Sequence, residues 1–213
     1  QIGLQQTTIT NAAFITAMYV IFVPLLVFLT SGARPAVLVW LSAFGCFIGV
    51  SLLNLGSLQQ LGSGDLLVLL AAIIWAVHVI LVGRFANQFE IPITMSCCQF
   101  FGCGLLGICF HILVEGMAVP ATFSNATLEI LYAGFISGGL AFTLQAVGQR
   151  FTSPSIAAIL MASESLFAAT FGALLLHERL RLPGYLGCLV IFTSIAIVEL
   201  LPSKPQPADS LDS

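Results

Sequence analysis

Long runs of apolar residues, separated by short polar links, dominate this sequence of 213 residues. The hydrocarbon layer of a bilayer is about 30 Å thick and a helix rises about 1.5 Å per residue, so one crossing takes about 20 apolar residues. Seven runs reach roughly that length. They lie near residues 11–30, 36–55, 66–86, 93–114, 128–148, 156–176 and 183–201. Apolar and polar residues do not alternate within the runs, so the pattern predicts seven transmembrane helices and disfavours strands.

The amino-acid composition also indicates a protein surrounded by lipid. Hydrophobic residues make up 59% of the chain and charged residues 7%, with a mean hydropathy of +1.08, whereas a soluble domain carries about a quarter charged residues. A surface so poor in charge is compatible with lipid rather than with water. The net charge of −3 is modest, and we do not expect nucleic acid as a partner.

The six cysteines are predicted to be structural. All of them fall inside predicted spans, where a thiol behaves as a small apolar side chain, and their spacing matches no zinc motif. They are Cys46, Cys97, Cys98, Cys103, Cys109 and Cys188. We therefore assign them to helix packing, and we expect neither a metal nor a cofactor.

The two ends of the chain suggest a piece of a longer protein. The first residue is Gln1 rather than Met, and no basic stretch precedes the first apolar run, so we expect no cleavable signal peptide. Residues 1–6 would then be the end of an earlier helix. Residues 202–213 are rich in Pro, Asp and Ser, a composition that predicts a disordered tail.

An internal repeat relates the first two apolar runs to the last two. When Thr7 is aligned with Thr152, an offset of 145 residues, the alignment runs without gaps to Leu53 on Val198. Nine positions are identical, which is modestly above chance for apolar segments, and the ungapped register is the stronger evidence. Besides the Thr pair, the identities are Ala12–Ala157, Ala13–Ala158, Ala17–Ala162, Phe22–Phe167, Leu29–Leu174, Arg34–Arg179, Leu41–Leu186 and Phe47–Phe192.

The two copies are five predicted helices apart. Because five is odd, they enter the membrane from opposite sides, and the repeat is inverted. If the unit is five helices, residues 66–201 form one whole unit, residues 1–57 are the end of another, and residues 58–65 link them. The sequence therefore predicts an all-α membrane protein, the remnant of a ten-helix bundle of two inverted five-helix repeats.

The basic residues predict the orientation of the bundle. By the positive-inside rule, the side that carries more Lys and Arg is cytoplasmic. Arg34, Arg84, Arg150 and Lys204 fall on one side, and Arg179 and Arg181 fall on the other. This margin of four against two predicts a cytoplasmic C-terminus.

Several short motifs carry a family likeness. They are Thr10–Phe14, Trp75-Ala76 followed by Arg84, Thr152–Ser155, Ser163–Ser165 and His177–Leu180. In these motifs the chain resembles the EamA family of the drug/metabolite transporter superfamily, over almost its whole length. The resemblance implies two inverted five-helix repeats and the export of amino acids, metabolites or drugs, with proton coupling in many members. It also implies a multi-pass protein of the cell membrane, which in a bacterium is the inner membrane.

The sequence departs from the family pattern at two places. The family usually has Pro after the mid-helix Glu and at the matching point of the first repeat, where this chain has Ser165 and Val20. The helix break that such a Pro makes would be weaker or displaced, with Pro24 as the candidate position. In the loop of the first repeat, Ala33 stands where the second repeat has Glu178, so an ion pair would be lost there.

Glu164 is the first candidate for a transport residue. It lies near the centre of the sixth apolar run, where an ionised carboxylate costs several kcal/mol unless it is paired or hydrated. Such residues usually face a cavity and bind substrate or carry protons, although a protonated Glu bonded to a neighbouring helix is the structural alternative. Tyr19 occupies the equivalent position of the first repeat, so we expect it near the pseudo-twofold axis and the substrate.

Three further residues are candidates for lining the substrate path. Trp75 and His78 are one helical turn apart, so they share a face and could offer a flat wall and a titratable ring. Interfacial anchoring of Trp75 and simple packing of His78 are the alternatives. Gln145 stands four residues before Gln149 and needs a hydrogen-bond partner in lipid, either along the path or on a neighbouring helix.

Two other motifs are assigned structural roles. Gly134 and Gly138 form a small-xxx-small face, which predicts close helix packing. In the loop that joins the last two spans, we expect Glu178 and Arg179 to pair and to cap the helix ends.

Seven spans are also typical of receptors and retinal proteins. Retinal requires a lysine inside the last span, and the only lysine, Lys204, lies in the tail, so retinal is excluded. A ligand receptor and a structural membrane subunit stay open as alternatives, although an inverted repeat with a mid-span carboxylate favours transport.

An enzyme is not expected, because no paired nucleophile and base is visible within the spans. The expected partners are a small-molecule substrate and the lipid bilayer. The packing stripes of small residues leave a homodimer open, because such stripes also serve contacts within one chain.

Overall fold

The computed structural model describes residues 1–32, 34–55, 62–114, 126–175, 177 and 179–201 of the chain. Within these residues all regular structure is helical and no strand is found. The helices divide into two compact units, Gln1–Leu81 with Ser153–Ser213 and Val82–Thr152. The expectations for Ala33, Glu178, residues 58–61 of the linker and the tail concern residues outside the described part.

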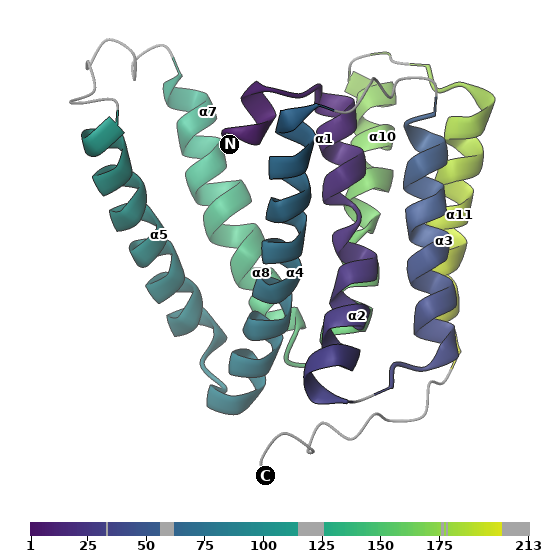
Figure 1. Ribbon diagram of the computed structural model, residues 1–213, viewed down its shortest axis with the longest axis horizontal. Helices are drawn as coiled ribbons and strands as arrows, with labels where there is room; N and C mark the ends of the chain where they lie inside the picture. The colour runs from purple at the N-terminus through teal and green to yellow at the C-terminus, as the bar shows by residue number, and fades with distance from the viewer. Residues whose placement is uncertain (33, 56–61, 115–125, 176, 178, 202–213) are drawn as a thin grey trace. The chain divides into compact units, whose positions relative to one another are not determined.

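The helices follow the predicted apolar runs closely (Figure 1). In chain order they are η1 (Gly3–Gln5), α1 (Ile9–Thr16), α2 (Tyr19–Ser31), α3 (Val37–Leu53), α4 (Ser63–Phe89), α5 (Pro92–Val114), α7 (Thr127–Leu131), η2 (Tyr132–Ala141), α8 (Phe142–Gly148), α9 (Pro154–Met161), α10 (Ser163–Leu175) and α11 (Leu182–Leu200). The prediction of a multi-pass, all-α membrane protein is confirmed.

Six stretches of the described chain are long and apolar enough to cross a membrane. They are Ile9–Ser31, Ser63–Phe89, Pro92–Val114, Thr127–Gly148, Pro154–Leu175 and Leu182–Leu200. The remaining predicted span, near residues 36–55, forms the shorter helix α3 of 17 residues. Ala36 is extended at its start, and at its end the Asn54 side chain donates a hydrogen bond to the Val50 carbonyl at 2.9 Å. With these ends, helix α3 is roughly 26 Å long.

Two of the spans in the first unit are broken, and they break at matching places. Helix α1 ends before Ala17, and α9 ends before Ala162, its counterpart at the 145-residue offset. Ala17 has φ −59° and ψ −14°, and Ala162 has φ −59° and ψ −15°. The break expected at Pro24 is wrong, because Pro24 lies inside continuous α2.

The hydrogen bonds at the two breaks also correspond. The amide of Val20 donates to the Ala17 carbonyl at 3.2 Å, and the amide of Ser165 donates to the Ala162 carbonyl at 3.2 Å. These i→i+3 bonds tighten the chain for one turn, so each span is interrupted without a proline. The absence of Pro at these positions has not removed the break.

The starts of the two broken spans are capped alike. Thr8 is extended and its hydroxyl accepts from the Asn11 amide at 3.2 Å, while Ser153 is extended and its hydroxyl accepts from the Ile156 amide at 3.4 Å. Each cap satisfies one of the free amide groups at a helix N-terminus. Thr8 and Ser153 are again 145 residues apart.

Helices α3 and α11 make the closest contact of the first unit, and Figure 1 shows them side by side. A Cβ atom on Gly187 would lie 2.5 Å from the Gly49 carbonyl oxygen, and one on Gly49 would lie 2.8 Å from the Gly187 carbonyl oxygen. A Cβ atom on Gly45 would meet Ser194. Gly45, which precedes Gly49 in α3, contacts Ser194, which follows Gly187 in α11, so the two helices run antiparallel.

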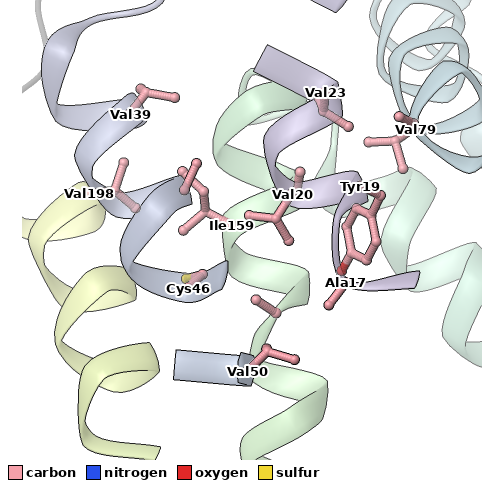
Figure 2. Packing of buried hydrophobic residues seen from close by; sticks show 14 of the residues in the cluster. Ala17, Tyr19, Val20, Val23, Val39, Cys46, Val50, Val79, Ile159 and Val198 are labelled. Atoms are coloured by element: carbon pink, nitrogen blue, oxygen red, sulfur yellow. The ribbon is translucent and has the colours of Figure 1, made fainter. Parts of the chain in front are cut away.

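A buried apolar cluster joins these helices to the two breaks. It combines Val20 and Val23 of α2, Cys46 of α3, Ile159 of α9 and Val198 of α11 (Figure 2). Ala17 and Ala162 belong to the same cluster and are 8% and 3% exposed. The breaks therefore lie within the packed core of the first unit.

The second unit combines the end of α4 with α5, η2 and α8. The rings of Phe100 and Phe142 meet edge to face, with centroids 5.9 Å apart. The Asn87 amide group donates to the Gln149 carbonyl at 3.2 Å, and Arg150 forms an ion pair with Glu90 at 3.8 Å. These contacts join the end of α4 and the start of α5 to α8 and the residues that follow it.

The packing expected in the second unit is found only in part. A Cβ atom on Gly134 would meet nothing within 4 Å, whereas one on Gly138 would lie 4.0 Å from the Phe100 ring of α5. The four cysteines of α5, Cys97, Cys98, Cys103 and Cys109, are exposed. Little of the described chain covers these helices, whereas Cys46 is buried in the first unit as expected.

Candidate functional site

Tyr19 and Glu164 both stand just after a helix break. Tyr19 is the first residue of α2 and Glu164 is the second residue of α10. Tyr19 is 2% exposed and lies in the apolar cluster (Figure 2), whereas Glu164 is exposed. An exposed carboxylate and a buried hydroxyl thus stand at equivalent positions of the two breaks.

The helix breaks change the hydrogen bonding of the backbone next to Tyr19 and Glu164. Where a helix is interrupted, some backbone carbonyls lose their partners four residues later, and the new helix begins with free amide groups. In membrane proteins such broken helices are tolerated where they line a cavity or are buried in protein. The region around Ala17 and Ala162 therefore combines backbone polar groups with the Glu164 carboxylate.

Trp75 and His78 stack on each other in α4. Their ring centroids are 4.9 Å apart and the ring planes are inclined by 23°, so the shared face predicted from the spacing is present. Trp75 packs against the apolar cluster of the first unit. His78 Nε2 is buried and has no hydrogen-bond partner among the described residues. This nitrogen is a polar group that a substrate or a water molecule could satisfy.

Gln145 lies in the second unit and has a structural partner there. Its side-chain amide donates to Gln149 Oε1 at 3.4 Å. Gln149 is 2% exposed and its carbonyl accepts from Asn87. The bond between Gln145 and Gln149 lies within one helical turn, so it decides neither alternative for Gln145, whose side chain is half-buried.

Asp65 is a buried carboxylate that the sequence did not single out. It is 5% exposed, accepts a hydrogen bond from the Thr7 hydroxyl, and accepts another from the Gly62 amide at 2.6 Å. The bond from the Gly62 amide to Asp65 is one half of a capping box, and Gly62 has no side chain to form the other half. The signal was the sequence Gly62-Ser63-Gly64-Asp65, which places an acidic residue at the start of a long apolar run.

Comparison with known protein families identifies the family of this chain. The model of the EamA-like transporter family matches residues 62–200, from the residue before α4 to the last residue of α11. The chain belongs to the EamA-like transporter family. The likeness first carried by the short sequence motifs is thereby confirmed.

One relative of this EamA-like chain is a protein named "Uncharacterized transporter" from Archaeoglobus fulgidus (strain ATCC 49558 / DSM 4304 / JCM 9628 / NBRC 100126 / VC-16). It is 27% identical over 203 residues, which cover 93% of this chain and 63% of the relative. The chain thus spans about 63% of the length of the relative that it matches. The family match includes Glu164, Trp75, His78 and Gln145, while Tyr19 lies before it.

Metal chemistry gains no support from the described part of this EamA-like chain. Among the described residues, no group of three or more His, Cys, Asp or Glu side chains is arranged to hold a metal ion. The polar side chains that follow the two breaks are instead one carboxylate and one hydroxyl.

Proposed function

We propose that this chain forms the greater part of an exporter of small metabolites, amino acids or drugs that works by alternating access. Membership of the EamA-like transporter family and the transporter name of the Archaeoglobus relative support this proposal. The structural observation that carries it is the pair of equivalent breaks at Ala17 and Ala162, with Tyr19 and Glu164 beside them. Broken helices near the middle of a bundle are a recurring way to build substrate sites in transporters.

The proposed architecture is two inverted five-helix repeats, with residues 1–57 ending the first and residues 66–201 forming the second. The contacts between α3 and α11 support it. Gly49 meets Ile191, and Cys46 meets Ser194. At the 145-residue offset, Gly49 corresponds to Ser194 and Cys46 to Ile191, so each contact is the counterpart of the other. Such exchange is what a twofold axis between equivalent antiparallel helices produces.

The proposed substrate site centres on Glu164 and Tyr19. Glu164 would carry the proton or bind a positively charged group, and Tyr19 would donate a hydrogen bond from the opposite repeat. Trp75 and His78 would offer a flat wall with one unpaired nitrogen, in keeping with their stacked rings. A site of this kind suits solutes that combine a charge with an apolar or planar part.

The proposed setting is the cell membrane, which in a bacterium is the inner membrane, with a cytoplasmic C-terminus. The distribution of Arg and Lys residues supports this orientation. A small-molecule substrate and the surrounding bilayer are the proposed partners. A homodimer stays open as an arrangement of the intact protein.

Flux measurements test the proposal. Protein reconstituted into proteoliposomes would be given an imposed pH gradient, a panel of radiolabelled amino acids and the fluorescent cation ethidium. We expect movement of at least one probe to follow the gradient, and Glu164→Gln to abolish that dependence. The matched control is Glu129→Gln, which removes an exposed carboxylate at the start of α7.

Two outcomes would contradict the proposal. Wild-type flux equal to that of empty liposomes for every probe would favour a receptor or a structural subunit. Flux that ignores both the gradient and Glu164→Gln would remove Glu164 from the mechanism.

A further inference from the structure

A cavity of about 230 Å³ lies where α3 ends and α11 begins. Its walls include Leu52, Leu53 and Leu55 from the end of α3, and Arg179, Arg181 and Gly184 from the loop and first turn of α11. All of these residues belong to the first unit. The cavity is distant in sequence from both helix breaks and plays no part in the proposed transport site.

Two guanidinium groups and three leucines give this cavity an amphipathic lining. Arg179 and Arg181 are both exposed, and Arg181 has extended backbone with φ −76° and ψ 164°. Guanidinium groups present several N–H donors in a planar fork that matches the oxygens of a phosphate group. Leu52, Leu53 and Leu55 also line the cavity, whose exposed lining is mainly polar.

The start of α11 adds a third favourable element. Arg181 precedes the helix and makes no side-chain capping bond, and Pro183 stands in the first turn. The N-terminal end of this 19-residue helix therefore carries partial positive charge without a side-chain cap. Gly184 is buried in the first turn, and a Cβ atom there would lie 3.2 Å from Leu180 Cβ.

The position of the cavity along the helices agrees with a lipid surface. The last residue of α3 is Leu53 and the first residue of α11 is Leu182, so the cavity lies at the level where two spans leave the hydrocarbon layer. Phosphate groups of phospholipids lie at this level, and basic pockets between transmembrane helices bind anionic headgroups.

We propose that the cavity at the junction of α3 and α11 binds a phosphate group through Arg179 and Arg181. The leucine wall would contact the glycerol and first methylene groups when the phosphate belongs to an anionic phospholipid. Free phosphate shares the charged part of this chemistry but leaves the leucines without a partner. The occupant would pin the ends of α3 and α11 together.

Binding of defined lipids to the purified protein tests this proposal. Native mass spectrometry would count bound phosphatidylglycerol against phosphatidylcholine with the same acyl chains, and thermal unfolding would be followed with each lipid and with inorganic phosphate. We expect phosphatidylglycerol to bind and to raise the melting temperature. In Arg179→Gln with Arg181→Gln, the affinity should fall on the order of tenfold or more, because each basic residue contributes to anionic-lipid binding.

A charge-matched control separates a site from general attraction. Arg34→Gln with Arg84→Gln removes the same charge from two exposed residues that do not line the cavity, and it should bind phosphatidylglycerol like the wild type. The single variants Arg179→Gln and Arg181→Gln should each show part of the loss, and unfolding without lipid checks that they are folded. Protection by inorganic phosphate that equals that of phosphatidylglycerol would assign the cavity to free phosphate. Equal loss in the control pair, or unchanged binding in the Arg179 and Arg181 variants, would overturn the proposal.

Discussion

Ala17 and Ala162 share one backbone conformation, with φ −59° at both and ψ −14° and −15°, although 145 residues separate them in the chain. Each ends one half of a membrane span, and each lies in the same buried cluster. Neither break contains Pro or Gly. The two interruptions therefore arise without a helix-breaking residue, and the polar side chains that follow them, Tyr19 and Glu164, become the centre of the functional account.

The glycine contact between α3 and α11 should be sensitive to a single methyl group. In Gly187→Ala the new Cβ atom would lie 2.5 Å from the Gly49 carbonyl oxygen, which forces the helices apart. We expect a loss of about 1–3 kcal/mol in the free energy of unfolding, as for overpacked cores. Thermal unfolding in detergent or lipid measures it.

Gly104→Ala on α5 is the matched control, because a Cβ atom there would meet nothing within 4 Å. Its stability should equal or exceed that of the wild type, since alanine is the better helix former. Equal stability losses at Gly187 and Gly104 would argue against the close antiparallel contact.

The bond between Thr7 and Asp65 should couple the start of the chain to α4. The buried Asp65 carboxylate accepts from both the Thr7 hydroxyl and the Gly62 amide, so Asp65→Ala removes two hydrogen bonds and should cost about 1–3 kcal/mol of unfolding free energy. Thr7→Val should cost less, because Asp65 keeps the Gly62 amide as a donor. Unfolding of the two single variants and the double variant measures the interaction. Additive losses would mean that the two side chains do not interact in the membrane.

The stacked pair in α4 should affect substrate affinity more than stability. In Trp75→Phe a smaller ring remains against His78, and we expect KM for a transported probe to rise roughly three- to tenfold with little change in melting temperature. Trp40→Phe is the control, since Trp40 also stacks on a ring, that of Phe44 at 6.1 Å, but on α3. A similar rise in KM for both variants would contradict a specific role of Trp75.

Hydropathy predicted the helices of this chain well, because a span is defined by a local property of about 20 consecutive residues. It was less informative where neighbours decide the outcome. The run near residues 36–55 yields a shorter helix because the chain is extended at Ala36 and turned at Asn54. The exposure of Cys97 and the open space around Gly134 depend on how much of each helix the rest of the chain covers.

The candidate site was predictable in part. The 145-residue offset predicted that Tyr19 and Glu164 are equivalent, and in the structure each follows a helix break. The place of the break was mispredicted at Pro24, because a local rule about proline was applied where core packing determines the geometry. Asp65 was missed because its role depends on Thr7, which is 58 residues away in the chain and comes close only in the fold.

The central claim is that the two copies of the repeat cross the membrane in opposite directions, and thiol labelling tests it most directly. In a version of the protein whose six cysteines are replaced, Arg34→Cys and Arg179→Cys place single thiols at equivalent loop positions. A membrane-impermeant maleimide is then applied to intact cells and to opened membranes. The account predicts that the thiol at position 179 reacts in intact cells and that the thiol at position 34 reacts only after the membranes are opened. Reaction of both thiols from the same side would contradict the inverted repeat.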